Sequence, residues 1–286
     1  MKAILTGAGG QLGQQWLEWA KGQSGVKLFP FTRDELDITN AAEFDKKLGT
    51  LKADLWINCA GYTQVDRAED EPVQAFRINA EAVAGIASWC HENQIKLIHY
   101  STDYVFSGSD EDRIRYPEGY PEYAETAPIG TYGMSKAEGE KQIQKRLENA
   151  LILRVSWLCG AFGHNFVKTM LRLSAERSEI RVVADQVGAP AFCEDIVVQS
   201  MDLVRLDARG IFHLGSRGLC SWFEFAKEIL NTWERSCTII PIPSSEFPTK
   251  ALRPTFSKLD IRAYESLTGK SCPQWKNSLA NLKPKL

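Results

Sequence analysis

The segment "KAILTGAGGQLG", residues 2–13, decides how the rest of this sequence is interpreted. It begins with a short apolar run that predicts a strand over 2–6 and continues into glycines at positions 7, 10 and 13. A glycine-rich turn between a strand and a helix is typical of the first unit of a dinucleotide-binding fold. Glycines also gather in turns that bind nothing, so the remaining sequence has to distinguish the two readings.

Each glycine has a distinct expected role in such a turn. Gly7 would allow a tight turn, Gly10 would let the backbone approach a pyrophosphate, and Gly13 would let the following helix pack on the strand. The N–H groups that begin the helix would face phosphate oxygens. We include Gln11 and Leu12, which lie in the same turn, among the residues expected to bind the cofactor.

Strand and helix patterns alternate through the first 156 residues. Apolar runs predict strands at 2–6, 26–31, 54–60, 95–101 and 150–156, and amphipathic stretches predict helices near 11–22, 40–48, 73–92 and 132–148. The alternation predicts an α/β fold with a Rossmann-type doubly wound parallel sheet. Ligands of such sheets bind at the carboxyl ends of the strands, so polar residues there are candidates for a site.

The later part of the chain is less regular. Its patterns predict helices near 164–177, 192–206 and 221–234, and short strands at 180–184, 210–215 and 237–241. We expect residues 1–156, together with about 191–215, to form the cofactor-binding domain, and the remainder of 157–286 to form a smaller C-terminal α/β lobe that binds the substrate. The long stretch 107–131 is expected to be a lid, because structureless loops of that length usually serve binding.

The ends of the second and third strands suggest which cofactor binds. Arg33 follows the second strand, where a guanidinium suits a 2′-phosphate, so NADPH is favoured and NADH remains possible. The alternative is a solvated surface arginine. Asp37 and Ile38 would border the adenine. In "NCAGY" (58–62), the residues expected to contact the cofactor as it crosses the sheet edge are Ala60, Gly61 and Tyr62.

Tyr132 and Lys136 are four residues apart at the start of a predicted helix and so share one face. A lysine ammonium beside a tyrosine would lower the pKa of the phenol and let it exchange a proton near neutral pH. The segment "YSTDYVFSG" (100–108) ends the fourth strand at the same edge of the sheet. Its Thr102 is expected to bind the substrate oxygen beside Tyr132, Asp103 to bind a sugar hydroxyl or tune the site, and Tyr100 to contact the cofactor.

With these motifs the chain resembles the dTDP-4-dehydrorhamnose reductase family of extended short-chain dehydrogenases. The matching segments run through nearly the whole chain and include "GAGGQLG", "INCAGYTQVDRAE", "STDYVFSG", "YGMSKAEGE", "LRVSWLCG" and "VVADQVGAP". The resemblance implies reduction of dTDP-4-dehydro-L-rhamnose to dTDP-L-rhamnose. It assigns catalysis to Thr102, Tyr132 and Lys136, with Tyr132 as proton donor, and a sugar contact to Trp157. Arg253 is the candidate for the substrate diphosphate, since a guanidinium binds phosphate oxygens bidentately; the alternative is a loop salt bridge.

The sequence departs from the family pattern at three places. "RPTFSKLD" has Phe256 where the family usually has asparagine, and the 107–131 loop is longer than typical. Some relatives bind magnesium at a position that is Gln15 here, so we predict no metal. Two other functions stay open: a reductase or epimerase of another nucleotide-linked deoxysugar, and a non-catalytic regulatory subunit similar to the beta subunit of methionine adenosyltransferase.

The composition excludes some classes of partner. The chain has 286 residues and a formal net charge of −2, which provides no basic surface for nucleic acid. Its seven cysteines include no CxxC pair, so we expect reduced thiols in a cytoplasmic protein. The glycine turn begins too close to Met1 to leave room for a signal peptide, and no apolar run has the length of a membrane span. We expect a nucleotide sugar as the ligand and a homodimer as the assembly.

Overall fold

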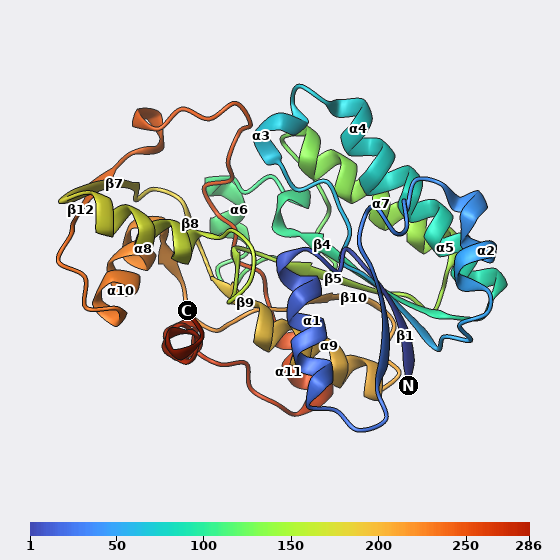
Figure 1. The fold of residues 1–286 in the computed structure, drawn as a ribbon. Helices are drawn as coiled ribbons and strands as arrows, with labels where there is room; N and C mark the ends of the chain where they lie inside the picture. The colour runs from blue at the N-terminus through green and yellow to red at the C-terminus, as the bar shows by residue number, and fades with distance from the viewer.

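The computed structural model describes residues 1–286 and has a six-stranded parallel sheet at its centre (Figure 1). The strands are β1 (Lys2–Thr6), β2 (Lys27–Phe31), β3 (Leu55–Asn58), β4 (Lys96–Thr102), β5 (Leu151–Val155) and β10 (Gly210–His213). They are hydrogen-bonded in the order β10-β5-β4-β3-β1-β2. Every pairing is parallel, so all six carboxyl ends lie at one edge.

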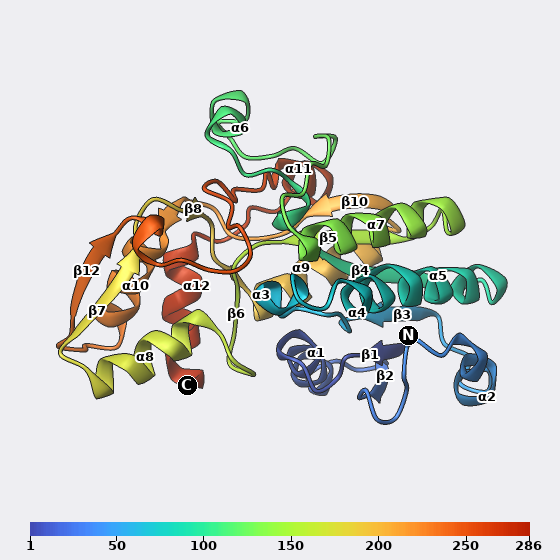
Figure 2. The ribbon, with the colours of Figure 1, turned by 90° about the horizontal axis from the view of Figure 1, so that it is seen from above.

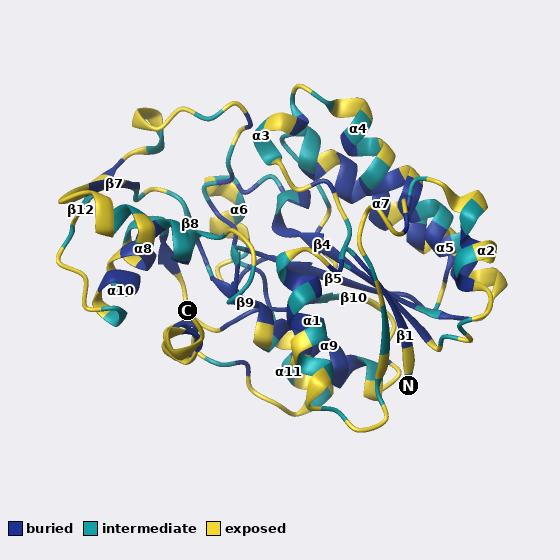
Figure 3. Cartoon of the chain, in the orientation of Figure 1, coloured by how far each residue is buried: buried dark blue, intermediate teal, exposed yellow.

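Helices cover both faces of the sheet. One face carries α1 (Gln11–Lys21), α9 (Cys193–Arg205) and α11 (Arg262–Thr268), and the other carries α2 (Phe44–Leu48), α5 (Ala82–Glu92) and α7 (Thr131–Arg146). Two apolar cores, one on each side, bury the central strands almost completely, as Figure 3 shows by their dark blue colour. Parallel strands covered on both faces must be continuously apolar, which explains why they could be found in the sequence. The arrangement confirms the predicted Rossmann-type fold.

The predicted helix over 73–92 is interrupted in its middle. The chain there forms α4 (Pro72–Phe76), a π-helical turn η2 (Arg77–Glu81) and then α5. The π turn brings the carbonyl oxygen of Asn79 against α7, where a Cβ on Gly139 would lie only 2.1 Å from it. A hydrophobic period of one helical turn does not distinguish a π turn from an α turn, and such turns are frequent at functional sites.

A smaller lobe lies beyond the carboxyl ends of the sheet strands, as the view from above shows (Figure 2). It contains α8 (Phe166–Glu176), β7 (Glu179–Val183), α10 (Trp222–Thr232), β12 (Thr238–Ile242) and α12 (Trp275–Leu282), with β7 and β12 paired in parallel. Short strands β6 (Leu158–Cys159), β8 (Val187–Gly188), β9 (Ala191–Phe192) and β11 (Cys220–Ser221) connect it to the rest. The lobe has its own apolar core, so two separately packed units face each other.

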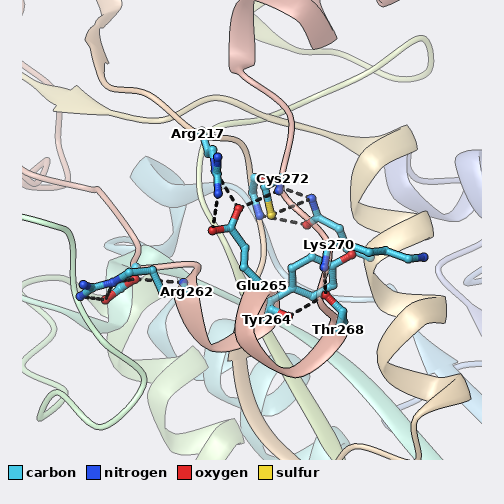
Figure 4. Close-up of polar contacts among 10 residues, drawn as sticks. Arg217, Arg262, Tyr264, Glu265, Thr268, Lys270 and Cys272 are labelled. Atoms are coloured by element: carbon cyan, nitrogen blue, oxygen red, sulfur yellow. Dashed lines mark hydrogen bonds and ion pairs between the residues drawn. The ribbon is translucent and has the colours of Figure 1, made fainter.

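Residues 260–272 differ from the predicted division of the chain, because they pack on the Rossmann domain and not on the lobe. Tyr264 and Cys272 belong to the same apolar core as β1 and α1. The Tyr264 hydroxyl donates to the buried carboxylate of Asp202 on α9 (2.9 Å), and Arg217 makes a bidentate pair with Glu265 (2.8 and 2.9 Å; Figure 4). The chain therefore packs on the Rossmann domain again after it has formed most of the smaller lobe.

The 107–131 loop is docked on the protein and contains a short helix, α6 (Asp110–Arg115). Tyr120 is 2% exposed, stacks on Phe106 with ring centroids 4.1 Å apart, and exchanges backbone hydrogen bonds with Lys258 and Asp260. No residue of the loop lines the pocket described below. The expectation of a lid over that pocket is therefore wrong for this conformation, because the loop closes against the 254–260 segment. No helix of the chain combines the length and apolar character needed to cross a membrane.

Candidate active site

A pocket of about 970 Å³ lies between the carboxyl edge of the sheet and the smaller lobe. Most of the residues predicted from the sequence line it: Gly7, Gly10, Gln11, Leu12, Arg33, Asp37, Ile38, Ala60, Gly61, Tyr62, Tyr100, Thr102, Asp103, Tyr132, Lys136 and Trp157. Gly13 and Arg253 do not line it. Segments from both domains thus meet around one cavity.

The glycine turn is shaped by close backbone contacts. Gly7 has φ +72°, and a Cβ there would lie 2.5 Å from the Ala60 nitrogen. A Cβ on Gly13 would lie 2.2 Å from the Gly7 carbonyl oxygen, so Gly13 lets α1 approach the turn even though it does not face the pocket. Gly10 is the N-cap of α1 and has no side-chain cap, which leaves the first N–H groups of the helix available to an anion.

Gln11 joins the glycine turn to the smaller lobe. Its side-chain amide donates to the carbonyl of Leu158 (3.1 Å) and accepts from Asn165 (2.8 Å). Asn165 also caps α8 by accepting from the Lys168 N–H (3.1 Å). The amide of Gln11 is therefore already engaged in holding the two sides of the pocket together.

Two arginines border the far end of the pocket. Arg33 is exposed and makes no ion pair, while Arg77 of the π turn donates to the Thr39 hydroxyl (3.2 Å). The exposed Asp37 carboxylate accepts from the N–H and hydroxyl of Thr39 (2.9 and 2.8 Å), and these hydrogen bonds hold its pKa below the usual value. Sequence reasoning missed Arg77, because no local pattern shows that a residue 44 positions after Arg33 shares its surroundings.

Asn79, a second residue that the sequence analysis missed, holds the third-strand turn in place. Its Oδ1 accepts from the Tyr62 N–H (2.8 Å), and its Nδ2 donates to the Tyr62 carbonyl (3.0 Å) and to the Ser135 hydroxyl (2.9 Å). Ser135 lies on α7 between Tyr132 and Lys136, so one buried amide fixes the Gly61–Tyr62 turn relative to the catalytic candidates. The residues around Asn79 in the sequence give no sign of this role, which becomes visible only from its place in the π turn.

The N-terminus of α7 presents Tyr132 to the pocket. Glu69 caps this helix by accepting from the N–H and hydroxyl of Thr131 (2.8 and 2.9 Å). Desolvation raises the pKa of Tyr132, although its side chain retains some exposure to the pocket, and the Asp103 carboxylate acts in the same direction. The predicted lowering of this pKa by Lys136 is therefore wrong for the cofactor-free protein, because burial outweighs it. A phenol with a raised pKa is protonated at neutral pH, as a proton donor must be.

Lys136 makes no hydrogen bond to Tyr132, and its side chain is engaged with β4. Its Nζ donates to the Tyr100 carbonyl (2.5 Å) and lies 3.0 Å from Nε2 of the buried His99. Burial lowers the pKa of Lys136 to about 8. The Tyr100 ring points the other way, toward α1 and α9, where its hydroxyl accepts from Trp16 (3.1 Å). Alternate residues of a strand face opposite sides, so Tyr100 offers Lys136 its backbone and not its side chain.

Thr102 and Asp103 lie at the end of β4 and are both buried. The Thr102 hydroxyl donates to Asp103 Oδ1 (3.0 Å) and accepts from the Tyr104 N–H (3.2 Å). The other carboxylate oxygen, Asp103 Oδ2, has no hydrogen-bond partner, and burial raises the pKa of Asp103 to about 6. This end of the strand therefore combines a capping role with a buried, unsatisfied carboxylate oxygen on a residue that lines the pocket.

Trp157 lines the lobe side of the pocket in a strained backbone conformation with φ +48°. Its indole stacks on Trp222 with ring centroids 3.5 Å apart and an interplanar angle of 12°. Gly188 makes room for it, since a Cβ there would lie 2.8 Å from the indole. A non-glycine residue held at positive φ is a costly feature that tends to occur at ligand sites.

Arg253 lies outside the pocket in an ion pair. Its Nη2 is 2.5 Å from the Asp66 carboxylate and its Nη1 donates to the Tyr104 hydroxyl (3.0 Å). Lys250 also pairs with Asp70, and the Ala251 N–H donates to Asp66 (3.1 Å). The structure thus shows the alternative considered for Arg253, a salt bridge that ties the 250–253 segment to α3 (Val65–Ala68).

Comparison with known proteins identifies the family. A family model described as the RmlD substrate binding domain matches residues 1–285. A dTDP-4-dehydrorhamnose reductase of Sinorhizobium fredii is 35% identical over 293 residues, which cover 99% of this chain and 96% of the relative. The chain belongs to the dTDP-4-dehydrorhamnose reductase family. A dTDP-4-keto-6-deoxy-D-glucose reductase of Streptomyces niveus is 32% identical, with coverage of 99% and 96%.

Solved structures agree with this family. A dTDP-4-dehydrorhamnose reductase of Bacillus anthracis in complex with NADP superimposes with a TM-score of 0.93 and 38% identity, covering 100% of this chain and 99% of that one. UDP-glucose 4-epimerase of Thermus thermophilus has a TM-score of 0.78 at 15% identity and shares the fold. The resemblance found in the sequence is confirmed.

The structure connects two of the departures from the family pattern. Phe256 is 2% exposed and packs beside Tyr120 of the 107–131 loop, with ring centroids 5.7 Å apart. Its backbone N–H and that of Thr255 both donate to the Gly108 carbonyl (3.0 and 2.9 Å). The aromatic residue and the longer loop therefore belong to one apolar cluster, and Phe256 acts there as a core side chain.

Proposed function

We propose that the protein reduces dTDP-4-dehydro-L-rhamnose to dTDP-L-rhamnose, with NADPH as the reductant and Tyr132 as the proton donor. The observation that carries the proposal is the single pocket that brings the glycine turn, Thr102, Tyr132 and Lys136 together at the carboxyl edge of the sheet. Membership of the reductase family supplies the substrate class.

The residues around the pocket fit a dinucleotide cofactor. The uncapped start of α1 and the glycine turn would hold the pyrophosphate, and Arg33 with Arg77 would bind the 2′-phosphate of the adenosine ribose. Asp37 and Ile38 would border the adenine, and Ala60, Gly61 and Tyr62 the middle of the cofactor. Lys136 would bind the nicotinamide ribose, and Gln11, Leu12 and Tyr100 line the same surface. When bound, NADPH supplies the hydride.

The chain itself supplies the proton. Tyr132 is protonated at neutral pH and gives its proton to the oxygen of the substrate ketone as carbon 4 is reduced, which leaves a phenolate on the enzyme. The Thr102 hydroxyl lies in the same end of the pocket and would orient that oxygen. Lys136 lines the same pocket and would stabilise the added negative charge.

On the substrate side, Trp157 would stack on the deoxyhexulose and Asp103 would accept from one of its hydroxyls through the unpartnered Oδ2. Arg253 would bind the diphosphate only after releasing Asp66, so substrate binding would exchange one anion for another at this guanidinium.

The test is the loss of NADPH absorbance with purified protein and dTDP-4-dehydro-L-rhamnose, followed by identification of the sugar nucleotide formed. Oxidation with dTDP-L-rhamnose as the product supports the proposal. Bound NADPH without oxidation of this substrate contradicts it. The name of the 32% identical Streptomyces relative makes dTDP-4-keto-6-deoxy-D-glucose the second substrate to assay. Light scattering of the same sample measures the predicted homodimer.

Arg33 provides a prediction about cofactor choice. Arg33→Ala removes a charged donor from the expected 2′-phosphate site, so the KM for NADPH should rise about 10- to 100-fold, as the loss of a charge-assisted hydrogen bond implies. The KM for NADH, which lacks that phosphate, should change less than threefold (roughly the scatter of a neutral surface substitution). Arg172→Ala, which removes an exposed arginine of α8, is the matched control. An equal rise in KM for NADPH and for NADH would show that Arg33 does not bind the 2′-phosphate.

A further inference from the structure

A line of buried hydrogen bonds crosses the sheet and ends at Lys136. The Trp56 indole N–H donates to the Thr6 hydroxyl (3.1 Å), which donates to Oδ1 of Asn58 (2.8 Å). Asn58 Nδ2 lies 3.0 Å from His99 Nδ1, and His99 Nε2 lies 3.0 Å from Lys136 Nζ. Thr6, Asn58, His99 and Lys136 are each no more than 5% exposed, so the members must satisfy one another.

A backbone N–H determines which atoms donate and which accept along this line of hydrogen bonds. The Ala60 N–H donates to Asn58 Oδ1 (3.2 Å), and a backbone N–H can only donate. The oxygen of the Asn58 amide must therefore face Ala60 and Thr6, and its NH₂ group must face His99. The reverse orientation of the amide would place two donors against each other.

The direction of the Asn58 amide sets the tautomer of His99. Because Asn58 Nδ2 donates, His99 Nδ1 must accept, and it cannot carry a proton. Burial holds the pKa of His99 well below its usual value, so the ring is neutral. A neutral imidazole has one N–H, which here must be on Nε2, the atom that faces Lys136.

An Nε2–H can bond Lys136 only if the lysine offers a lone pair, which an ammonium lacks. We infer that, in the cofactor-free protein, His99 donates to the uncharged form of Lys136 and so stabilises that form, and that Asn58, which does not touch the lysine, determines this preference by fixing the tautomer of His99. The uncharged amine then donates one of its two hydrogens to the Tyr100 carbonyl and keeps the other for the pocket.

The other charged and titratable groups around Lys136 do not reverse this assignment. Glu140, one turn along α7, favours the ammonium, but it is already paired with Arg154 of β5 (2.6 Å). Tyr132, on the same helix, is neutral, and Asp103 of η3 (Asp103–Val105) directs its carboxylate to Thr102. No carboxylate makes an ion pair with Lys136, in contrast to most buried lysines.

This inference deepens the proposed function, on which it rests for the role of Lys136 in turnover. The uncharged form of Lys136 can take up a proton when negative charge develops in the pocket, such as the Tyr132 phenolate formed by protonation of the substrate. His99 and Asn58 are then positioning residues that set how readily Lys136 gains that proton.

The test measures the protonation of Lys136 directly in the cofactor-free protein, so its outcome does not depend on any activity. Protein labelled with ¹³C at the lysine Cε is titrated by NMR, and the Lys136 signal is identified by its absence in Lys136→Met. The wild-type midpoint is expected near pH 8. In Asn58→Leu and in His99→Gln, the midpoint should rise by about one pH unit, the shift that one ordinary hydrogen bond produces.

The two variants act by different routes. Asn58→Leu frees His99 to change its tautomer and accept from the ammonium, whereas the amide of His99→Gln can turn its oxygen toward Lys136. His91→Leu, which removes an exposed histidine of α5, should leave the midpoint unchanged. The high-pH limb of kcat/KM should move with the NMR midpoint, which a purely structural role would not produce. An unchanged or lower midpoint in folded Asn58→Leu and His99→Gln would overturn the inference.

Discussion

Tyr132→Phe is expected to lower kcat about 10²- to 10⁴-fold while leaving the affinity for NADPH within a factor of about two to three. The substitution removes one hydroxyl from a side chain that lies at the pocket beside Thr102, and the proposed reaction takes its proton from that hydroxyl. The ring and its edge-to-face contact with Tyr104 (centroids 5.5 Å apart) remain, so the pocket keeps its shape. Steady-state kinetics and a fluorescence titration with NADPH measure the two quantities.

Tyr123→Phe is the matched control for this variant. Tyr123 is 88% exposed on the 107–131 loop, outside the pocket, so loss of its hydroxyl should leave kcat unchanged. If Tyr132→Phe turned over at more than about a tenth of the wild-type rate, below the smallest effect expected for general acid catalysis, another group would be the proton donor.

Arg154→Met is expected to destabilise the protein by about 3–5 kcal/mol, the cost of leaving a buried charge unpaired. Arg154 and Glu140 are 2% and 3% exposed and form a bidentate pair (2.9 and 2.6 Å). Arg154 also approaches the neutral His213, whose Nε2 accepts from Nη1 (3.3 Å), since burial lowers the pKa of His213 to about 3. Without the guanidinium, the Glu140 carboxylate loses its ion-pair partner in this interior.

Chemical unfolding of three variants measures this effect. Arg172→Met, which breaks an exposed pair with Glu176, should change the free energy of unfolding by less than about 1 kcal/mol. The double variant Glu140→Leu/Arg154→Met should be more stable than Arg154→Met alone, because it removes the unpaired charge as well. A loss in Arg154→Met as small as that of Arg172→Met would show that the buried pair contributes little.

The sequence was sufficient to predict the elements of the sheet and many of the residues that line the pocket, for reasons that are local. Buried parallel strands are continuously apolar, and the predicted strands of the sheet end within two residues of those observed. The glycine turn requires Gly7 at positive φ and Gly13 at a close helix contact, and both requirements are visible as glycines at fixed spacing.

The features that the sequence did not predict are pairings between distant segments. Nothing near Lys136 in the sequence shows that His99 of β4 is its partner, so the spacing of Tyr132 and Lys136 suggested a pairing where the structure shows a hydrogen bond to another element. In the same way, Arg253 is paired with Asp66, 187 positions earlier in the chain. A helical or strand period indicates which face a side chain occupies, but not which residue of another element faces it.

The return of residues 260–272 to the Rossmann domain has a consequence for how the protein is made. Tyr264 and Cys272 complete the core that also contains Ala3 and Leu5, so the first strand cannot be fully covered until nearly the whole chain has left the ribosome. During synthesis at about 5–20 residues per second, part of the apolar surface of the early strands therefore stays exposed to solvent for several seconds or longer. This chain is therefore expected to depend on chaperones that bind nascent polypeptides more than a protein whose first domain closes on itself.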